Sequence, residues 1–294
     1  MLEQKQKINI QRDSNIEPIG LFFLIKRSVH KVDPNIFLAM IISGFFLLIL
    51  LFTEWYVTNN DIPRTILPLP SDVFRYLYEN LTLGSTFYGE NLLEKSWVSM
   101  RDALAGFGIS VILGSAIGVI FAKFEIIKES LHPPLFIIQL LPVPAFAPVV
   151  AALLGYGTET KILIIVLFTI FPVVIAVESA VRSIPKEYYA LMKGFNSSRV
   201  KTMTSLVIPG IVPDLFVTMR ILATASFVGS IVAELPLVVT SGIGKDLYNS
   251  FNNQIPLRVW SSLIVIACVA LAFYFSVVFV GNFVDKKYRY GRFQ

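Results

Sequence analysis

Charged residues that fall inside or beside long apolar stretches are the first candidates for chemistry in this sequence. Glu178 and Arg182 lie near the end of one stretch, Asp214 and Arg220 near the start of the next, and Glu234 at its far end. Inserting such a charge into a bilayer costs about 2.5 to 3.5 kcal/mol, so each needs a partner or a function. Glu178 and Arg182 are four residues apart, which favours an ion pair on one helix. Arg220 is expected either to line a pore or to pair with Asp214, and both interpretations stay open.

A glycine pair followed by lysine superficially resembles a phosphate-binding loop. These residues are Gly242, Gly244 and Lys245, but Val239 and Asp246 occupy the positions where that motif needs Gly and Ser or Thr. The sequence therefore predicts no ATP-hydrolysing motor in this chain. No other cluster predicts catalytic residues, so the chain is expected not to be an enzyme and to bind no cofactor.

Composition indicates an integral membrane protein. Hydrophobic residues make up 55% of the 294 positions and charged residues only 15%, against about 25% charged in soluble domains. The net charge of +5 gathers in particular loops, which indicates membrane topology and not nucleic-acid binding. His30 and His132 are far apart and predict no metal site, and Cys268 lies in an apolar run where a thiol packs inertly. The polar, basic residues 1–35 predict no cleavable signal peptide.

The apolar pattern predicts an all-α membrane protein with about six transmembrane helices. A cytoplasmic segment, 1–35, precedes the first helix at 36–52, and an extracytoplasmic amphipathic segment follows at 53–102. A membrane core at 103–283 holds the other five spans, and a basic tail occupies 284–294. The core spans are expected at 103–122, from Pro134 to about Leu154, and at 162–181, 206–234 and 259–283.

Glycine, proline and surface patterns add detail to these segments. Gly114 and Gly118 share one helix face and predict close approach of another helix. Three prolines, Pro142, Pro144 and Pro148, predict a broken third span, because each removes a backbone donor inside the membrane. In the 53–102 segment, Val73, Phe74, Leu77 and Tyr78 are expected to form one face of a short amphipathic helix.

The distribution of basic residues orients the spans. The side that carries both termini holds 17 of the 25 Lys and Arg residues, and the opposite side holds seven. Because basic loops stay in the cytoplasm, both termini and the 182–209 loop are predicted to be cytoplasmic.

The 182–209 loop has the pattern of a helix, a break and a second helix. Pro185 fits a first helical position, Glu187 the first turn, and Asn196 a left-handed stop. Ser197 or Ser198 can cap the second helix. On that helix Val200, Met203 and Val207 are predicted to share one face. The unit is interpreted as a rigid knob on the membrane surface, and an ordinary basic loop is the alternative.

Four segments carry a resemblance to a known family. They are SMRDALAGF at 99–107, LLPVPAFAPVVAALLGYGTETKI at 140–162, IPGIVPDLFVTMRILATASFVGSIVAE at 208–234 and TSGIGKDL at 240–247. In this order they resemble the inner-membrane permeases of bacterial ABC importers for nitrate, taurine, aliphatic sulfonates and related small solutes. The resemblance covers roughly the last two-thirds of the chain.

The cytoplasmic signature of that family, the EAA loop, is degenerate here. Anchoring on Pro209 puts Asn196 where the family has Gly, and Ala190, Leu191 and Met192 where it has Glu-Ala-Ala. Asn tolerates a left-handed turn, so the loop is expected to fold normally. Either Glu187 partly replaces the missing acid, or a heterodimeric partner carries the stronger loop.

The resemblance implies a type I ABC importer permease, MetI-like in architecture, in the cell (inner) membrane. It also implies a second permease copy in a homodimer or heterodimer, two cytoplasmic ABC ATPase subunits that hydrolyse ATP, and an extracytoplasmic solute-binding protein. The expected solute is a nitrate-, sulfonate- or taurine-like anion, or a thiamine-precursor- or flavin-like nutrient.

We therefore predict two groups of functional residues in a permease coupled to a separate ATPase. The pathway candidates are Gln139, Phe146, Glu178 and Arg220. The ATPase-coupling residues are Glu187, Ala190, Leu191, Met192, Lys193, Asn196, Ser198, Arg199, Val200, Lys201 and Pro209. A passive channel or non-ABC transporter is the alternative, and it predicts flux without ATP. An intramembrane enzyme would need paired acids or histidines within the spans.

Overall fold

The computed structural model describes residues 34–60, 62–64, 66–83, 90–140, 142–235 and 241–288. Every regular element in these ranges is a helix, which confirms the all-α prediction. The chain divides into two compact units, residues 1–62 and 63–294. Nearly all of the predicted N-terminal segment 1–35, and the tail beyond Tyr288, lie outside the described residues.

In the described residues of the first unit, one long apolar helix, α3, runs over Pro34–Asn59. Its 26 residues exceed the roughly 20 that a bilayer core requires. The helix extends beyond both ends of the predicted 36–52 span.

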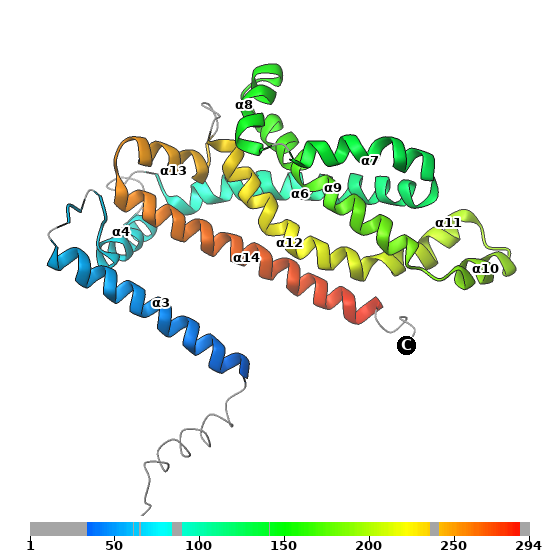
Figure 1. Ribbon diagram of the computed structural model, residues 1–294, viewed down its shortest axis with the longest axis horizontal. Helices are drawn as coiled ribbons and strands as arrows, with labels where there is room; N and C mark the ends of the chain where they lie inside the picture. Colours follow the sequence, from blue (N-terminus) through cyan, green and yellow to red (C-terminus); the bar gives the residue numbers. More distant parts are fainter. Residues whose placement is uncertain are drawn as a thin grey trace, which may run out of the picture. The chain divides into compact units, whose positions relative to one another are not determined.

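The described part of the second unit is built on four long helices, which Figure 1 shows. These are α6 (Leu92–Lys123), α9 (Thr158–Arg182), α12 (Ile208–Glu234) and α14 (Pro256–Tyr288). With α3, they supply the five described helices that are long and apolar enough to cross a membrane. α6 packs along α9, and α12 packs against both α9 and α14.

A continuous hydrophobic core joins these four helices. Phe107 of α6, Val177 of α9, Phe227 of α12 and Phe273 of α14 all belong to it. The rings of Phe107 and Phe273 meet edge to face, with centroids 5.6 Å apart, a favourable geometry for aromatic pairs. The core therefore holds the bundle together along its length.

Small residues set the spacing between α6 and α9. A Cβ placed on Gly114 would lie 2.7 Å from Cβ of Val173, and one on Gly118 would lie 2.7 Å from the carbonyl oxygen of Val174. Between these helices the hydroxyl groups of Ser110 and Thr169 are 2.7 Å apart. The close approach predicted for the Gly114 and Gly118 face is thus confirmed, and α9 is the helix that uses it.

The third predicted span forms two shorter helices. α7 covers Glu125–Leu140 and α8 covers Val143–Leu154. Pro142, which has no backbone N–H, stands before α8 with extended backbone angles. The break agrees with the prediction at Pro142, but Pro144 and Pro148 lie within α8 and do not interrupt it. α7 likewise continues through Pro133 and Pro134.

α6 begins at Leu92, well before the predicted start at Ala103. Asn91 caps the helix by accepting a hydrogen bond from the backbone N–H of Leu93, and Oδ1 of buried Asn80 accepts one from the N–H of Leu92. The 32 residues of α6 span about 48 Å at 1.5 Å per residue. Part of this helix therefore extends past a hydrocarbon core of about 30 Å.

The amphipathic helix α4, Pro70–Leu83, corrects one sequence prediction. Val73 is buried and Leu77 packs against the core, but Phe74 and Tyr78 are exposed. Residues 73, 77 and 80 follow the i, i+4, i+7 spacing of one face. The buried position at 80 is filled by polar Asn80, which is why a purely apolar pattern misassigned the face.

Short helices occupy the two ends of the bundle (Figure 1). α10 (Lys186–Gly194) and α11 (Arg199–Thr202) lie at one end, called here the α10 end. α13 (Ile243–Asn252) and α4 lie at the other, the α13 end. Each end carries one of the two polar arrangements described next.

Candidate functional site

The 182–209 segment folds as a helix, a turn and a second helix. Asn196 ends the first part with φ of +51°, the left-handed conformation that Asn tolerates better than most residues. Oγ of Ser198 caps the second part by accepting a hydrogen bond from the N–H of Lys201 at 3.2 Å. Pro185 is the N-cap of α10, so the helix begins one residue later than predicted, at Lys186. A single turn of π-helix, η1 (Met203–Val207), then leads into α12.

Apolar side chains stand exposed on this segment. Leu191, Phe195 and Val200 expose 54%, 73% and 72% of their surface. Met203, by contrast, packs against the core and Val207 is buried, so the helix face predicted for Val200, Met203 and Val207 divides between surface and interior. Phe195 is the apolar side chain at this surface that the sequence prediction missed.

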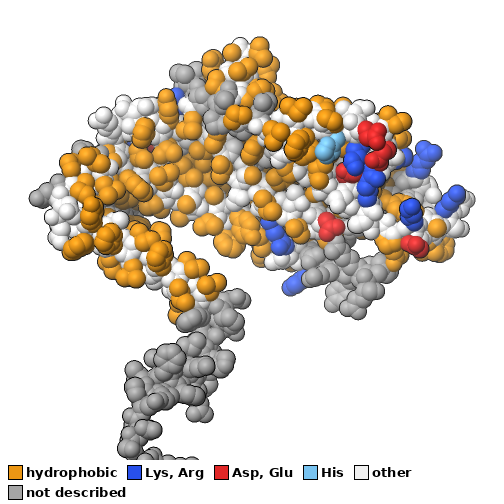
Figure 2. All heavy atoms as spheres, viewed as in Figure 1, with side chains coloured by type: hydrophobic (Ala, Val, Ile, Leu, Met, Phe, Trp, Pro, Cys, Tyr) orange, Lys and Arg blue, Asp and Glu red, His pale blue; other side chains and the backbone are white. Residues whose placement is uncertain are grey.

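Polar and charged residues surround the exposed apolar side chains. The exposed members are Glu187, Lys193, Arg199 and Lys201, with small Ala190 beside them and Met192 and Pro209 half-buried. On the face shown in Figure 2, Lys and Arg side chains gather at this end, together with acidic ones. An apolar surface rimmed by cations is typical of a protein-binding site.

An ion-pair network joins two helices, α7 and α9, beside this segment. Arg182 of α9 pairs through Nε with Oε1 of Glu178 at 2.8 Å, as the sequence predicted, and through Nη2 with Glu125 of α7. Lys128 of α7 also pairs with Glu178, at 2.9 Å. The hydrogen bond from Arg182 lowers the pKa of Glu125 from its usual value. The network fixes the end of α9 against α7.

A second, fully buried ion cluster lies at the α13 end. Nζ of Lys161 on α9 donates to Oε1 of Glu234 on α12 at 2.7 Å, and it lies 2.6 Å from Oδ2 of Asp102 on α6. The latter contact is an ion pair without hydrogen-bond geometry. All three side chains are at most 2% exposed. Buried charges are costly unless they are paired, so this cluster is the polar centre of the bundle.

Hydrogen bonds from Ser99 and α13 complete the cluster. Oγ of Ser99 donates to Oε1 of Glu234 at 2.7 Å and accepts from the N–H of Ile243 at 3.0 Å. The N–H of Gly244 donates to Oε2 of Glu234 at 2.8 Å. The glycine turn that superficially resembled a phosphate loop therefore binds a carboxylate of its own chain.

Close packing explains the glycines of this turn. A Cβ on Gly242 would lie 2.1 Å from Oε1 of Glu234, and one on Gly244 would lie 2.5 Å from the carbonyl oxygen of Ile231. Only glycine lets the backbone approach the carboxylate this closely.

Sequence reasoning named Glu234 but missed the cluster. Lys161 entered only the count of basic residues and Asp102 only marked the end of the 53–102 segment, because each stands alone at the edge of an apolar run. The four segments that carry the family resemblance each supply a member: Ser99 and Asp102, then Lys161, then Glu234, then Gly244. The presence of a cluster member in each of these four segments was the sequence signal that could have located the cluster.

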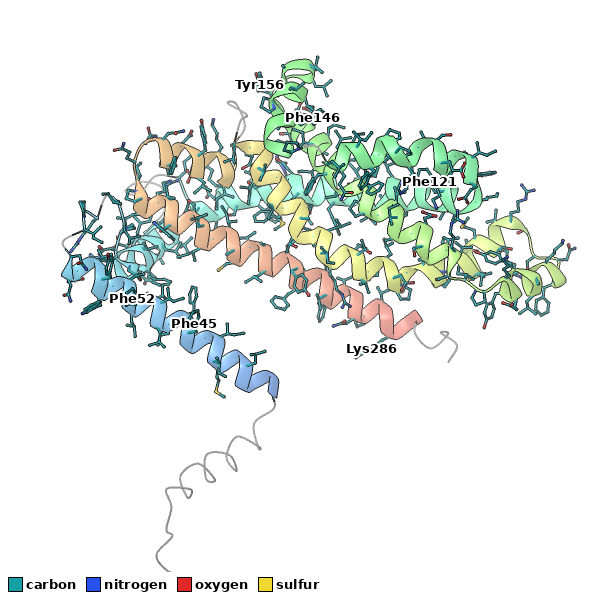
Figure 3. The ribbon with its side chains drawn as sticks, viewed as in Figure 1. Phe45, Phe52, Phe121, Phe146, Tyr156 and Lys286 are labelled. Carbon is teal, nitrogen blue, oxygen red and sulfur yellow. The ribbon has the colours of Figure 1, made fainter. Side chains whose placement is uncertain are left out.

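The four pathway candidates lie apart from one another. Gln139 is half-buried near the end of α7, and Phe146 of α8 packs on a small cluster with Ala147 and Ala233 (Figure 3). Glu178 belongs to the ion-pair network, and Arg220 donates from Nη2 to Oδ1 of Asn282 at 3.1 Å. No hydrogen bond or ion pair among the described residues joins any two of the four.

No group of three or more His, Cys, Asp or Glu within the described ranges is placed to hold a metal ion. The arrangement combines an exposed apolar and basic surface at one end with a locked ion cluster at the other. Such a molecule can bind a partner at one end and transmit movement through packed helices.

Comparison with known proteins supports the family resemblance found in the sequence. The family described as "Binding-protein-dependent transport system inner membrane component" matches residues 110–290. A probable ABC transporter permease protein from Haemophilus influenzae is 25% identical over 78% of this chain and 90% of its own length. The riboflavin transport system permease protein RibX from Chloroflexus aurantiacus is 28% identical over 78% and 82%. The nitrate import permease protein NrtB from Synechocystis is 22% identical over 64% and 68%.

The fold also matches a solved structure. A chain from inward-facing conformations of the MetNI methionine ABC transporter superposes with a TM-score of 0.58 at 14% sequence identity. The match covers 66% of this chain and 95% of the solved chain. At this identity the likeness concerns the fold alone, which is the MetI-like architecture expected from the sequence.

Proposed function

Because this chain belongs to the family of binding-protein-dependent transport system inner membrane components, we propose that its 182–209 segment is the site where a separate ATPase docks and drives import. The observation that carries the proposal is the exposure of Leu191, Phe195 and Val200 on a rigid helical turn. Large apolar side chains presented together at a polar surface are stabilised when a partner covers them. ATP is then hydrolysed by the partner, while this chain is the permease.

Charge supports a cytoplasmic position for this segment. The side of the predicted topology that holds both termini and the 182–209 segment carries 17 of the 25 basic residues, and basic residues stay inside. The α10 end then faces the cytoplasm, where the ATPase resides. The α13 end faces outward, toward a solute-binding protein.

The proposed assembly contains two permease chains around one pathway, two ATPase subunits and one extracytoplasmic binding protein. Pairing with an identical or a related permease chain fits the sequence equally. Movement of the ATPases would push the 182–209 segments and rock the long helices to which they connect through η1.

The proposed solute is a small nutrient or anion. Relatives are named as permeases for nitrate, bicarbonate, formylaminopyrimidine and riboflavin. Gln139, Phe146, Glu178 and Arg220 remain the pathway candidates. Among them Arg220 is half-buried on α12 and its Nε has no hydrogen-bond partner, so it is the best placed to attract an anion within a membrane.

Purification of the complex tests the proposal. The variant R199E/V200D replaces one exposed cation and one exposed apolar side chain by acids. Burying a valine contributes about 1.5 to 3 kcal/mol, and reversing a charge at the rim adds repulsion or removes attraction. We expect the detergent-purified variant to lose at least about 90% of the co-purifying ATPase, because 1.4 kcal/mol changes binding tenfold.

The matched control is I126D/K286E, which makes the same two types of change elsewhere. Ile126 of α7 is 80% exposed, and Lys286 lies exposed near the end of α14 (Figure 3). This control should retain the ATPase. Unchanged retention in R199E/V200D, with both proteins folded by size-exclusion chromatography, would reject the docking site.

A further inference from the structure

A pocket of about 590 Å³ opens at the α10 end, behind the proposed docking surface. Its walls come from the last turns of α6 and α9, from α10 and α11, and from η1. It therefore lies where two long apolar helices end and the polar 182–209 segment begins, which is the position expected for the membrane interface.

Four cations line this pocket, and no acidic side chain does. They are Lys123, Arg182, Lys186 and Arg199. Arg182 is already paired with Glu178 and Glu125. Lys123, Lys186 and Arg199 form no ion pair within the described residues. Nζ of Lys123 lies 5.2 Å from the centroid of the Phe124 ring, a contact that leaves its positive charge uncompensated.

The rest of the wall is mostly apolar. Val119 and Val181 contribute from the two long helices, and Met203 and Val207 from η1. Tyr189 of α10 adds an aromatic ring, and burial raises the pKa of its hydroxyl. The hydroxyl therefore stays protonated at neutral pH and can donate a hydrogen bond.

We propose that this pocket binds an anionic phospholipid, with the phosphate held by Lys123, Lys186 and Arg199 and the apolar part against Val119 and Val181. Basic pockets between transmembrane helices at the cytoplasmic face suit anionic headgroups. A charge-assisted hydrogen bond from Arg or Lys to phosphate is roughly twice as strong as a neutral one. The apolar walls favour a lipid over free phosphate, because free phosphate has no apolar part to bury.

The bound lipid would join the long helices to the docking segment. Lys123 stands on α6, whereas Lys186 and Arg199 stand on α10 and α11. One phosphate that contacts all three holds the segment against the helix ends. The assignment of the lipid to the inner leaflet rests on the orientation in the proposed function. The pocket and its charges are independent of that orientation.

Lipid binding to the purified full chain tests the proposal. The protein is placed in nanodiscs of phosphatidylcholine with increasing phosphatidylglycerol, and bound lipid is counted by native mass spectrometry. Wild type should retain phosphatidylglycerol in preference to phosphatidylcholine. K123Q/K186Q should bind phosphatidylglycerol about 10- to 30-fold more weakly, because each basic residue near an anionic lipid contributes roughly a fivefold factor.

Two further variants make the result specific. K245Q/K286Q removes two lysines that do not line the pocket and should bind phosphatidylglycerol as wild type does. A122F keeps every charge but fills part of the pocket wall at half-buried Ala122, and it should weaken binding. Equal binding by K123Q/K186Q and wild type, or equal loss in K245Q/K286Q, would overturn the proposal.

Soluble competitors distinguish the source of the phosphate. Inorganic phosphate and glycerol 3-phosphate at millimolar concentration should leave the retained phosphatidylglycerol unchanged. Displacement of the lipid by either would show a site for a free anion and overturn the lipid assignment. The test is separable from that of the docking site, because lipid retention is measured without the ATPase.

Discussion

Nζ of Lys161 lies 2.7 Å from Oε1 of Glu234 and forms with it an ion pair that is closed off from solvent. Asp102 adds a second carboxylate 2.6 Å from the same ammonium group. One cation thus joins α6, α9 and α12 at a single point. Removing one member of a buried pair is far more damaging than replacing the whole group, because the remaining charge has no partner.

The first prediction concerns Lys161. K161M leaves the carboxylate of Glu234 buried without a cation and leaves Asp102 paired only with exposed Arg101, 3.2 Å away, so it should destabilise the protein by about 3 to 5 kcal/mol. We expect a clear fall in melting temperature, measured on the detergent-purified chain by intrinsic fluorescence.

Two comparison variants test whether loss of the ion cluster causes the lower melting temperature of K161M. K245M removes a half-buried lysine at the same end, outside the ion cluster, and should melt close to wild type. The triple variant D102N/K161M/E234Q removes all three charges and should recover part of the loss. A melting temperature for K161M equal to that of wild type would mean that the pair contributes nothing.

The second prediction uses two glycines of the same helix. Gly114 faces Val173 so closely that an added Cβ would lie 2.7 Å from its Cβ, whereas an added Cβ on Gly108 meets nothing within 4 Å. G114A should therefore push α6 from α9 and cost about 1 to 3 kcal/mol. G108A should be neutral or stabilise by about 0.4 to 1 kcal/mol, since alanine restricts the unfolded chain. Equal melting temperatures for the two variants would contradict the close packing.

The third prediction is a pH dependence at the α10 end. The hydrogen bond from Arg182 lowers the pKa of Glu125 below 4.5, its ordinary value. A carboxylate with a lowered pKa contributes stability above its ordinary pKa and loses it as the pH falls through the lowered pKa. The gap in melting temperature between wild type and E125Q should therefore be largest near pH 7 and shrink below about pH 4.5. The gap should be small throughout, because both partners are exposed.

Glu129 provides the control for this titration. It is exposed on the same helix and forms no ion pair among the described residues. E129Q should have the melting temperature of wild type at every pH. The same pH-dependent difference from wild type in E125Q and E129Q would exclude a specific role for the Glu125 and Arg182 pair.

The sequence predicted those features whose causes are local. Asn196 and Ser198 indicated the turn and the cap of the 182–209 segment because both act on backbone groups within a few residues. The Glu178 and Arg182 pair followed from helical spacing alone. Gly114 and Gly118 indicated a packed face, but the helix that packs there came only from the structure.

The buried ion cluster depended on distant parts of the chain. Ser99 and Ile243, which share a hydrogen bond, are 144 positions apart, and no periodicity connects them. A lone charge at the edge of an apolar run has the same sequence pattern whether it faces water or a buried partner. Pro142 predicted the split of the third span, whereas Pro133 and Pro134 lie within α7 without breaking it.

The last prediction concerns Asn196, whose φ of +51° makes the turn between α10 and α11 possible. Asparagine tolerates this conformation, glycine adopts it freely, and a β-branched residue is strained there by about 1 to 2 kcal/mol. The side chain of Asn196 is exposed, so backbone strain is the main effect of replacing it. N196G should keep the melting temperature and the retained ATPase of wild type, whereas N196V should lower both. S205V, which places valine at an exposed position in right-handed helix, controls for β-branching itself. If N196V and S205V retain the ATPase equally, the left-handed turn does not shape the docking surface.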